Sequence, residues 1–307
     1  MFNIAEGSCG AHRESQVPAI LESLQIPFTG SSSLTLALAL EKAKTKQLLA
    51  YEGVHTPPWQ LFATPDDPLN PRLLFPLIVK PNREGSAKGI SRESVVSDEV
   101  GLRKQIRKVL AHYRQEALVE EFIDGLELTV GVLGNDEPQA LPILEIDFDG
   151  CEQSGEFFYS WRMKEYQGNQ SLGLAPRFYC PARLDPQVAA RIGAMAVHAH
   201  RALGCFDLSR TDIRLRRDGR VFVLEVNPLP GLDPLGSNFP LMTSAAGLSY
   251  PMLINRLVDL ALARYHQRGL SSLRAMHVGS AGWEGRHITQ PQELPPASQL
   301  AESGAAP

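Results

Sequence analysis

The sequence predicts a mixed α/β (α+β) protein, because strand-like and helix-like segments follow one another along the chain. One indication is a hairpin over residues 210–227, where two alternating segments flank Asp218-Gly219, a pair that suits a two-residue turn. Another is a helix-periodic segment over Pro186–Leu203. The third is a compact unit over residues 57–133, in which a strand at Leu77–Lys80 precedes a helix and two further strands.

Composition limits the class of protein. The chain has 307 residues, a formal net charge of −4 and 43% hydrophobic residues, which is typical of an enzyme with sizeable cores rather than of a polyanion-binding protein. The first residues lack the basic and apolar regions of a signal peptide, and no apolar run is long enough to span a bilayer. We therefore expect a cytoplasmic protein without nucleic-acid or membrane partners.

The cysteines are widely spaced and contain no Cys-x-x-Cys pair, which indicates neither a zinc site nor a disulfide framework. We expect reduced, structural thiols at Cys9, Cys151, Cys180 and Cys205. Histidines and tryptophans outside any motif are expected to pack rather than to react; these are His198, His200, Trp59 and Trp161. The arginines of the hairpin are offset by acids, so we do not interpret them as a nucleic-acid surface.

The N-terminal part is expected to begin with a short strand at Phe2–Ile4. Three helices should follow, at Glu14–Leu24, Leu34–Glu41 and Lys42–Tyr51. Gly53 is the expected end of the third helix, because glycine readily adopts the left-handed conformation found there.

The second half should contain a strand at residues 140–148 and an irregular polar connection over residues 150–182, a length typical of lids or binding segments. A helix over Tyr250–His266 closes the fold. Residues 270–307 carry scattered Gly, Pro and Ser without periodicity, so we expect a disordered tail.

The hairpin is expected to carry a site on one face. With Asp218 and Gly219 in the turn, Asp212 faces Glu225 and Arg210 faces Asn227. Because side chains alternate along a strand, these four polar residues project from the same face. The opposite, apolar face is expected to hold Ile213, Leu215, Phe222, Leu224 and Val226.

Two opposed carboxylates repel each other, so Asp212 and Glu225 need a compensating charge. Hard oxygen ligands from two acids and the Asn227 amide suit magnesium. The alternative is a solvated hairpin face on which Arg210 and Arg214 neutralise the acids. The rigid turn after Asn227 offers backbone amides for an anion beside a metal and favours the first interpretation.

Two further segments suit a nucleotide. Lys80 ends a strand and precedes a loop with Gly85 and Gly89; the spacing is wrong for a Walker A loop, but such a loop can still cradle phosphate. Alone, this segment is also compatible with a surface hairpin. Residues 119–127 offer a polar strand edge that could bond a purine, with Glu127 placed for ribose hydroxyls, although alone they would form an ordinary amphipathic hairpin.

In this order and spacing, the segments resemble an ATP-grasp ligase, and more narrowly a member of the D-alanine–D-alanine ligase family, over about residues 2–265. The motifs that carry the resemblance are Asn3–Gly7, Ile26–Gly30, Glu41-Lys42 with Thr45-Lys46, Ile78–Pro81 through Glu84–Ser86, Glu120–Gly125 with Glu127, Arg210–Asp212, and Glu225–Asn227 with Pro230-Gly231.

The resemblance implies an ATP-grasp fold with a truncated N-terminal α/β domain. The expected divisions are a remnant of that domain with linker helices (1–56), a small central ATP-grasp subdomain (57–133), a C-terminal ATP-grasp subdomain with the catalytic hairpin (134–269), and the tail (270–307).

The resemblance also implies roles for individual residues. ATP would be bound by Lys42, Lys80, Glu120, Glu121, Ile123, Glu127 and Lys164. Two Mg²⁺ or Mn²⁺ ions would be held by Asp212, Glu225 and Asn227. The substrates would be bound by Ser86, Arg210, Gly231 and Ser237, and the catalytic set would be Arg210, Ser86, Gly231 and Lys164.

The implied reaction joins two D-alanines for peptidoglycan synthesis. ATP would phosphorylate the carboxylate of the first D-alanine, and the amine of the second would attack the acyl phosphate to give the dipeptide, ADP and phosphate. Small amino acids, D-alanine first among them, are the expected partners, and a homodimer is possible. Two alternatives stay open: the same chemistry on a different small amino-acid pair, and an ATP-binding fragment without ligase turnover.

Three departures from the family pattern motivate those alternatives. The chain has Asn227-Pro228 where the family commonly continues Asn-Thr, and Lys164-Glu165-Tyr166 where it has Lys-Tyr, which displaces Tyr166 by one residue. A strand–helix–strand unit that would precede Asn3, together with an acid that grips the first substrate's amine, has no counterpart in the sequence. We therefore expect nucleotide binding to persist and dipeptide synthesis to be weak or absent. We also expect association or aggregation through the apolar edge beside Phe2.

Overall fold

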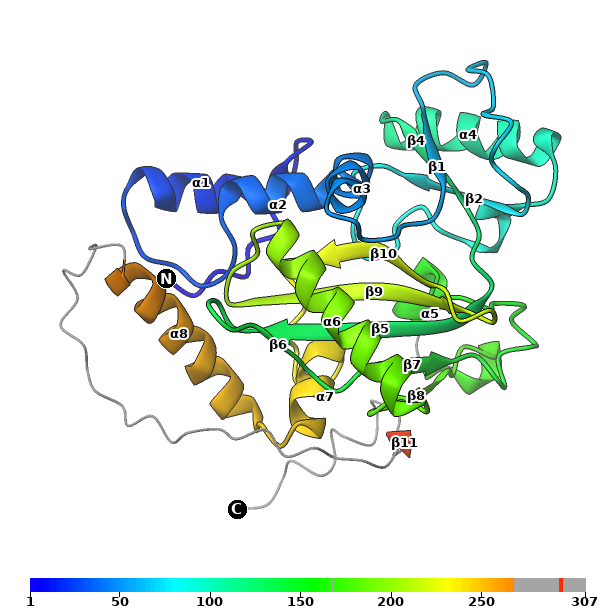
Figure 1. Cartoon of the computed structure of the whole chain (residues 1–307). Coiled ribbons are helices and arrows are strands. Elements are labelled where there is room, and N and C mark those ends of the chain that lie inside the picture. The colour runs from blue at the N-terminus through cyan, green and yellow to red at the C-terminus, as the bar shows by residue number, and fades with distance from the viewer. Residues whose placement is uncertain (167, 268–292, 295–307) are drawn as a thin grey trace.

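Two antiparallel sheets organise the molecule. The computed structural model describes residues 1–166, 168–267 and 293–294. The smaller sheet has the order β1-β4-β2-β3 and the larger one the order β10-β9-β5-β7-β8-β11, with β6 paired to β5. Figure 1 shows the smaller sheet as a separate lobe at one end of the larger sheet.

The smaller sheet is built from β1 (Trp59–Phe62), β2 (Leu77–Pro81), β3 (Val95–Val96) and β4 (Ala117–Glu121). Helix α4 (Glu99–Tyr113) packs on it through Leu102, Ile106 and Val109. Asp98 caps this helix, because its side chain accepts a hydrogen bond from the backbone of Gly101 at 2.7 Å. A short 3-10 helix, η2 (Arg92–Ser94), precedes β3.

The larger sheet is built from β5 (Gly125–Leu133), β6 (Gln139–Ala140), β7 (Leu144–Asp147), β8 (Arg177–Tyr179), β9 (Leu208–Arg216), β10 (Val221–Asn227) and β11 (Glu293–Leu294). Helix α6 (Pro186–Ala202) covers one face, and α7 (Asn238–Ala245) with α8 (Tyr250–Gln267) covers the other. Because side chains alternate, Leu128, Val130 and Val132 face α6, whereas Leu133 packs with α7 and α8.

Three N-terminal helices lie along the hairpin side of the larger sheet (Figure 1). They are α1 (Gln16–Ser23), preceded by η1 (Arg13–Ser15), α2 (Ser33–Leu40) and α3 (Lys42–Tyr51). The helices expected from the sequence in this region are confirmed, and α3 has the predicted bounds. A buried ion pair between Asp207 and Arg264 ties the segment before α2 to the body, since Asp207 also accepts a hydrogen bond from the Gly30 amide at 2.7 Å.

Some predicted elements are wrong. Residues 2–4 form no strand; the amide of Asn3 bonds to the Thr29 hydroxyl at 2.9 Å, and no described strand lies beside this segment to form a ladder. The connection over residues 150–182 is not irregular throughout, because it contains α5 (Trp161–Glu165), η3 (Gln170–Leu172) and β8. Neither β1 nor α7 was predicted, because each is too short to show a clear periodicity of hydrophobic residues.

The hairpin between β9 and β10 has a longer turn than predicted. The Arg216 amide donates to the Arg220 carbonyl at 2.9 Å, so three residues, 217–219, form the loop, and Gly219 has a φ of +81°. Near the turn, Val223 therefore pairs with Ile213, one residue away from the predicted register. A β-bulge between Val223 and Glu225 then restores the predicted pairing.

The bulge also changes the faces of β10. Val221 and Val223 join Val226 in the core cluster that packs against α6, whereas Phe222 and Leu224, which were expected on that face, lie outside it, although Phe222 is buried. Leu224 instead lines a cavity on the other side of the sheet. The functional pairs keep their predicted register because the two irregularities compensate.

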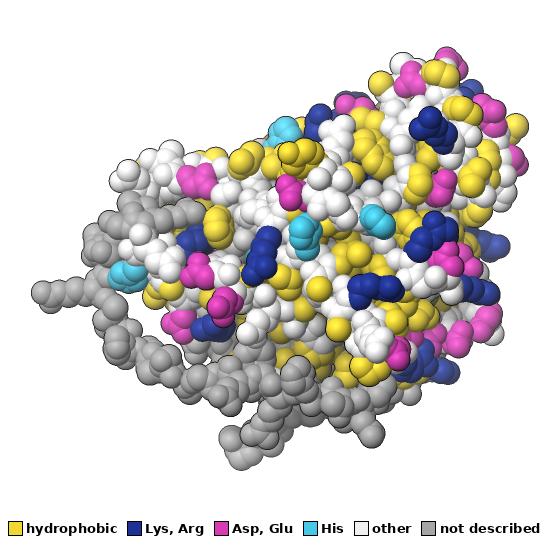
Figure 2. Space-filling model, in the orientation of Figure 1, with side chains coloured by type: hydrophobic (Ala, Val, Ile, Leu, Met, Phe, Trp, Pro, Cys, Tyr) yellow, Lys and Arg dark blue, Asp and Glu magenta, His cyan; other side chains and the backbone are white. Residues whose placement is uncertain are grey.

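The predicted tail lies outside the described residues, apart from Glu293–Leu294, which pair with β8. The domain limits stay predictions; the chain passes from the smaller to the larger sheet at residues 122–124. On the face shown in Figure 2, Lys and Arg side chains of the described residues are interspersed with Asp and Glu side chains. None of the described helices is long and apolar enough to cross a membrane.

Candidate active site

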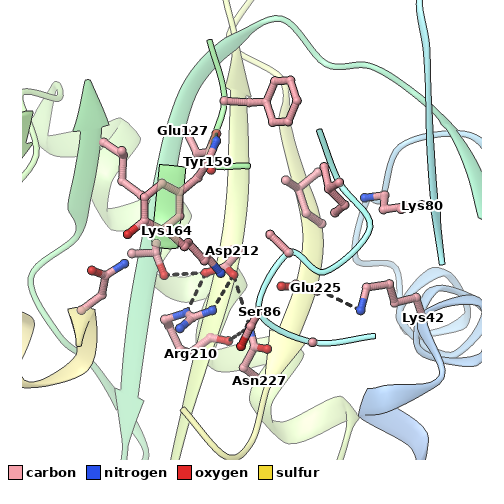
Figure 3. Close-up of a pocket in the computed structure, with 18 of the residues that line it drawn as sticks. Lys42, Lys80, Ser86, Glu127, Tyr159, Lys164, Arg210, Asp212, Glu225 and Asn227 are labelled. Carbon is pink, nitrogen blue, oxygen red and sulfur yellow. Dashed lines mark hydrogen bonds and ion pairs between the residues drawn. The ribbon is translucent and has the colours of Figure 1, made fainter. Parts of the chain in front are cut away.

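A cavity of about 360 Å³ lies where the two sheets meet, and the predicted site residues line it (Figure 3). Its walls come from β2 and the loop after it, β4, β5, the β9–β10 hairpin, α3 and the 150–182 connection. All the residues proposed for ATP, metal and substrate from the sequence line this cavity. The structure therefore brings these residues together, and their individual roles stay predictions.

Two lysines from different elements reach the cavity. Lys42, at the start of α3, donates to the carbonyl of Glu84 at 2.6 Å and lies 3.2 Å from a carboxylate oxygen of Glu225. Lys80, on β2, lies 2.6 Å from a carboxylate oxygen of Glu120. Both side chains are nearly buried, so their charges are poorly screened and attract an anion strongly.

Asp212 and Glu225 face the cavity from opposite strands of the hairpin. Asp212 accepts hydrogen bonds from Arg210 at 2.8 and 2.9 Å, from the Thr129 hydroxyl at 2.7 Å and from the Asn227 amide at 3.2 Å. The expectation that Arg210 neutralises an acid of this face thus describes part of the arrangement. Arg214, which had the same role in the alternative of a solvated hairpin face, pairs instead with Glu127 at 2.6 Å.

The electrostatics of the hairpin keep Glu225 and Arg210 ionised. Burial alone would raise the pKa of Glu225, but the charges of Lys42, Lys164 and Arg210 lower it well below its usual range. Burial would lower the pKa of Arg210, but the hydrogen-bonded carboxylate of Asp212 raises it. The site therefore presents fixed positive and negative charges at neutral pH.

The hairpin residues fit a hard divalent cation by their chemistry. Two carboxylates and one amide, from Asp212, Glu225 and Asn227, converge on one side of the cavity. Oxygen donors of this kind are the ligands that magnesium prefers. Within the described part of the chain, no group of three or more His, Cys, Asp and Glu side chains offers a competing metal centre.

Another end of the cavity suits a nucleobase and ribose. Glu120 and Ile123 are buried and line it, and Glu121 lines it while accepting a hydrogen bond from the Leu74 amide at 3.0 Å. Glu127 is oriented by Arg214 and by the Tyr159 amide, which donates at 3.2 Å. A carboxylate held in this way keeps one position and can accept hydrogen bonds from ribose hydroxyls.

The loop after β2 brings Ser86 to the cavity in an unusual backbone conformation. Ser86 and Ala87 have φ values of +54° and +55°, which side-chain-bearing residues adopt only where their surroundings impose it. Arg13 holds the loop by donating to the Arg83 carbonyl at 3.0 Å, and Lys42 holds it at Glu84. The position of Ser86 is thus determined by contacts outside its own loop.

Gly231 and Ser237 also line the cavity and lie against each other. A Cβ atom on Gly231 would lie 2.6 Å from the Ser237 hydroxyl, so a larger residue here would displace that hydroxyl. The Ser237 hydroxyl accepts a hydrogen bond from the Asp233 amide at 3.2 Å, which orients it. The two residues proposed for substrate from the sequence are therefore neighbours.

The 150–182 connection delivers Lys164 and Tyr159 to the cavity. Burial and the Arg210 charge lower the pKa of Lys164, and its ammonium group lies 5.2 Å from the centre of the Tyr159 ring. Tyr166 does not line the cavity; its side chain is exposed and its ring lies edge-on to Trp161 at 6.4 Å. The tyrosine of the site is thus Tyr159, which the sequence reading had not singled out.

Sequence reasoning missed several further residues. Glu6 and Glu14 line the cavity from the N-terminal segment, and burial raises the pKa of Glu14. Lys46 is buried against Glu120 at 2.9 Å. The segments of Glu6 and Lys46 belonged to motifs quoted for the resemblance, but only the packing of α3 and of the N-terminal segment shows where their side chains lie.

Known proteins that resemble this chain belong to the family suggested by the sequence motifs. A family model described as the D-alanine–D-alanine ligase C-terminus matches residues 48–259. The chain belongs to the D-alanine–D-alanine ligase family. It is therefore a ligase of the kind that forms carbon–nitrogen bonds, and its fold is the ATP-grasp fold.

Two relatives illustrate the range of this family. The D-alanine–D-alanine ligase of Nitratidesulfovibrio vulgaris is 40% identical over 247 residues, which cover 80% of this chain and 75% of the relative. An uncharacterized protein, y4sG, from Sinorhizobium fredii is 36% identical over 270 residues, covering 88% of this chain and 76% of the relative.

Solved structures of family members share the fold. The D-alanine–D-alanine ligase of Bacillus anthracis, complexed with ATP, matches with a TM-score of 0.66 and 28% identity, covering 83% of this chain and 76% of that one. The VanG D-Ala:D-Ser ligase of Enterococcus faecalis matches with a TM-score of 0.69 and 28% identity, and the match covers 85% of this chain and 72% of that one.

Proposed function

We propose that this D-alanine–D-alanine ligase family member uses ATP to join two D-alanines. The observation that carries the proposal is that one cavity is lined by the buried Glu120 carboxylate, by the ammonium groups of Lys42 and Lys80, and by the opposed acids of the hairpin. The first group suits a nucleobase and the lysines suit phosphates. Ser86, Gly231 and Ser237, at the remaining end, suit a small amino acid.

The proposed reaction has two steps. A carboxylate oxygen of the first D-alanine attacks the γ-phosphorus, the bond to the bridging oxygen breaks, and ADP leaves. The amine of the second D-alanine then attacks the acyl carbon, loses a proton, and inorganic phosphate leaves. Lys42, Lys80 and Lys164 would hold the phosphates in line, and Arg210 with the Gly231 amide would stabilise the negative charge that develops on the acyl oxygen.

Magnesium bound by Asp212, Glu225 and Asn227 would neutralise charge on the transferring phosphoryl group. The rest of the chain would contribute by keeping these three side chains in position. Thr129 and Arg210 fix the Asp212 carboxylate, and Lys42 lies against Glu225. Burial by the 150–182 connection would exclude water, which would otherwise hydrolyse an acyl phosphate.

A different second amino acid is the other candidate. The position of Tyr166 outside the cavity and the similarity to a D-Ala:D-Ser ligase favour a change at the acceptor end rather than at the nucleotide. The reaction would be the same, with another small amine as acceptor.

The test measures ADP release by the purified chain with each of a set of D- and L-amino acids, alone and in pairs, with mass analysis of the product. We expect release that depends on D-alanine and a product with the mass of its dipeptide. Release that requires a second, different amino acid would support the alternative. ATP binding without amino-acid-dependent ADP release would contradict ligase function for this chain.

A further inference from the structure

Lys46 is a buried lysine that the roles described above do not use. It lies on α3 one turn after Lys42, and its ammonium group lies 2.9 Å from one carboxylate oxygen of Glu120. Lys80 lies 2.6 Å from the other oxygen. The side chains of Lys46 and Glu120 are each 1% exposed, so a single buried carboxylate has two ammonium partners.

The two lysines are not equivalent. Lys80 and Glu120 line the cavity, whereas Lys46 lies behind Glu120 and does not line it. Lys80 can therefore turn to a ligand while Lys46 cannot. The trio holds two ammonium groups around one carboxylate. Burial lowers the pKa of Lys46 and the charge of Glu120 opposes this shift. Positive charge that the single carboxylate does not balance, in a poorly solvated place, favours an anion at Lys80.

When Lys80 binds an anionic phosphate, Glu120 loses one of its two cationic partners. A buried carboxylate without a partner becomes protonated, because desolvation penalises its charged form. Burial indeed opposes ionisation of Glu120, and the charges of Lys46 and Lys80 together lower its pKa. Lys46 is the partner that stays in place.

We propose that Lys46 is a positioning residue that keeps Glu120 ionised when Lys80 turns to the nucleotide phosphates, and that it thereby sets the preference for adenine over hypoxanthine. The proposal rests on the nucleotide site of the proposed function. Adenine presents an amino donor where hypoxanthine presents a carbonyl acceptor. An ionised carboxylate only accepts hydrogen bonds, whereas a protonated one can also donate.

The test uses ADP and IDP, which differ only in the base, and measures their dissociation constants in the presence of magnesium by calorimetry. Wild-type protein should prefer ADP by about tenfold or more, because a hydrogen bond to a charged group is lost with IDP. Lys46→Met removes the charge at similar length and should reduce this preference to about twofold, chiefly by weakening ADP binding. Lys46→Arg keeps the charge and should retain the preference.

A matched control is Lys44→Met, on the exposed side of the same helix, which should leave both constants unchanged. Glu120→Gln removes the carboxylate without changing its size and should lose the preference even if Lys46→Met does not fold. A purely packing role for Lys46 would weaken ADP and IDP equally.

The outcomes separate the two proposals. Wild-type protein that binds neither nucleotide would overturn the proposed function and this inference with it. Wild-type protein that binds ADP while Lys46→Met or Glu120→Gln keeps the full preference would overturn the role of Lys46 and leave the nucleotide site standing.

Discussion

Asp212 and Glu225 lie opposite each other in the β9–β10 ladder, and each carboxylate has a cation of its own. Arg210 bonds to Asp212 at 2.8 Å, and Lys42 reaches Glu225 at 3.2 Å from a separate helix. Two opposed acids would otherwise destabilise the hairpin. Because Lys42 belongs to α3, the hairpin is electrostatically linked to the N-terminal helices.

We predict that Glu225→Gln and Asp212→Asn each lower ligase turnover by at least about 100-fold, because each replaces a charged ligand by a neutral one at the proposed metal site. The measurement is ADP release over a magnesium titration, with circular dichroism to show that the fold is retained. Asp218→Asn, at the exposed turn of the same hairpin, is the control and should behave as wild type. Wild-type turnover in Glu225→Gln would rule out the metal assignment.

The hairpin and the pairing of these acids were predictable, although the length of its turn and the bulge in β10 were not. The sequence predicts a two-residue turn, whereas the loop has three residues and β10 has a bulge before Glu225. An extra loop residue shifts the register, and the bulge shifts it back. Neither leaves a local sequence signal, so Leu224 was assigned to the wrong face.

Helices with clear caps were predicted well. Asp185 caps α6, and Gly53 and Gly204 follow α3 and α6 with positive φ, so local chemistry alone set these limits. The missed site residues depend on distant packing instead. Tyr159 and Lys46 acquire their roles only because the 150–182 connection and α3 fold against strands far away in sequence.

We predict that Tyr159→Phe lowers turnover by about tenfold, whereas Tyr166→Phe leaves it unchanged. Burial raises the pKa of Tyr159, so its hydroxyl stays protonated at neutral pH and can donate a hydrogen bond in the cavity (Figure 3). Tyr166 lies outside. The measurement is kcat and KM for D-alanine in both variants, and a larger loss in Tyr166→Phe would show that the connection rearranges when substrates bind.

We predict that Arg264→Met lowers the free energy of unfolding by about 3–5 kcal/mol, because it leaves the buried Asp207 carboxylate without its cation. Arg264 lies 3.0 Å from Asp207 and also donates to the carbonyls of Phe28 and Gly30 at 2.9 and 3.1 Å. Denaturant unfolding measures the change. Arg256→Met, on the exposed side of α8, is the matched control, and an equal effect of the two substitutions would contradict a special role for the ion pair.

The last prediction concerns pH and His200. This side chain is buried on α6, its Nδ1 lies 2.7 Å from the Ser209 hydroxyl, and burial lowers its pKa to about 4. The unfolded chain binds a proton with a pKa near 6.5, so between these values the unfolded state holds more protons than the folded state. Stability should therefore fall as the pH falls from about 6.5 to about 4, by up to about 3 kcal/mol from this residue.

Denaturant unfolding at several pH values measures that slope. His200→Asn should remove the part of this pH dependence that His200 causes, because asparagine does not titrate. The variant will be less stable than wild type at pH 7. His198→Asn is the control: His198 lies two residues away on the same helix and is exposed, with its Nε2 at 2.8 Å from the Glu52 carbonyl. If His200→Asn keeps the wild-type slope between pH 6.5 and 4, the acid sensitivity arises from the carboxylates and not from this histidine.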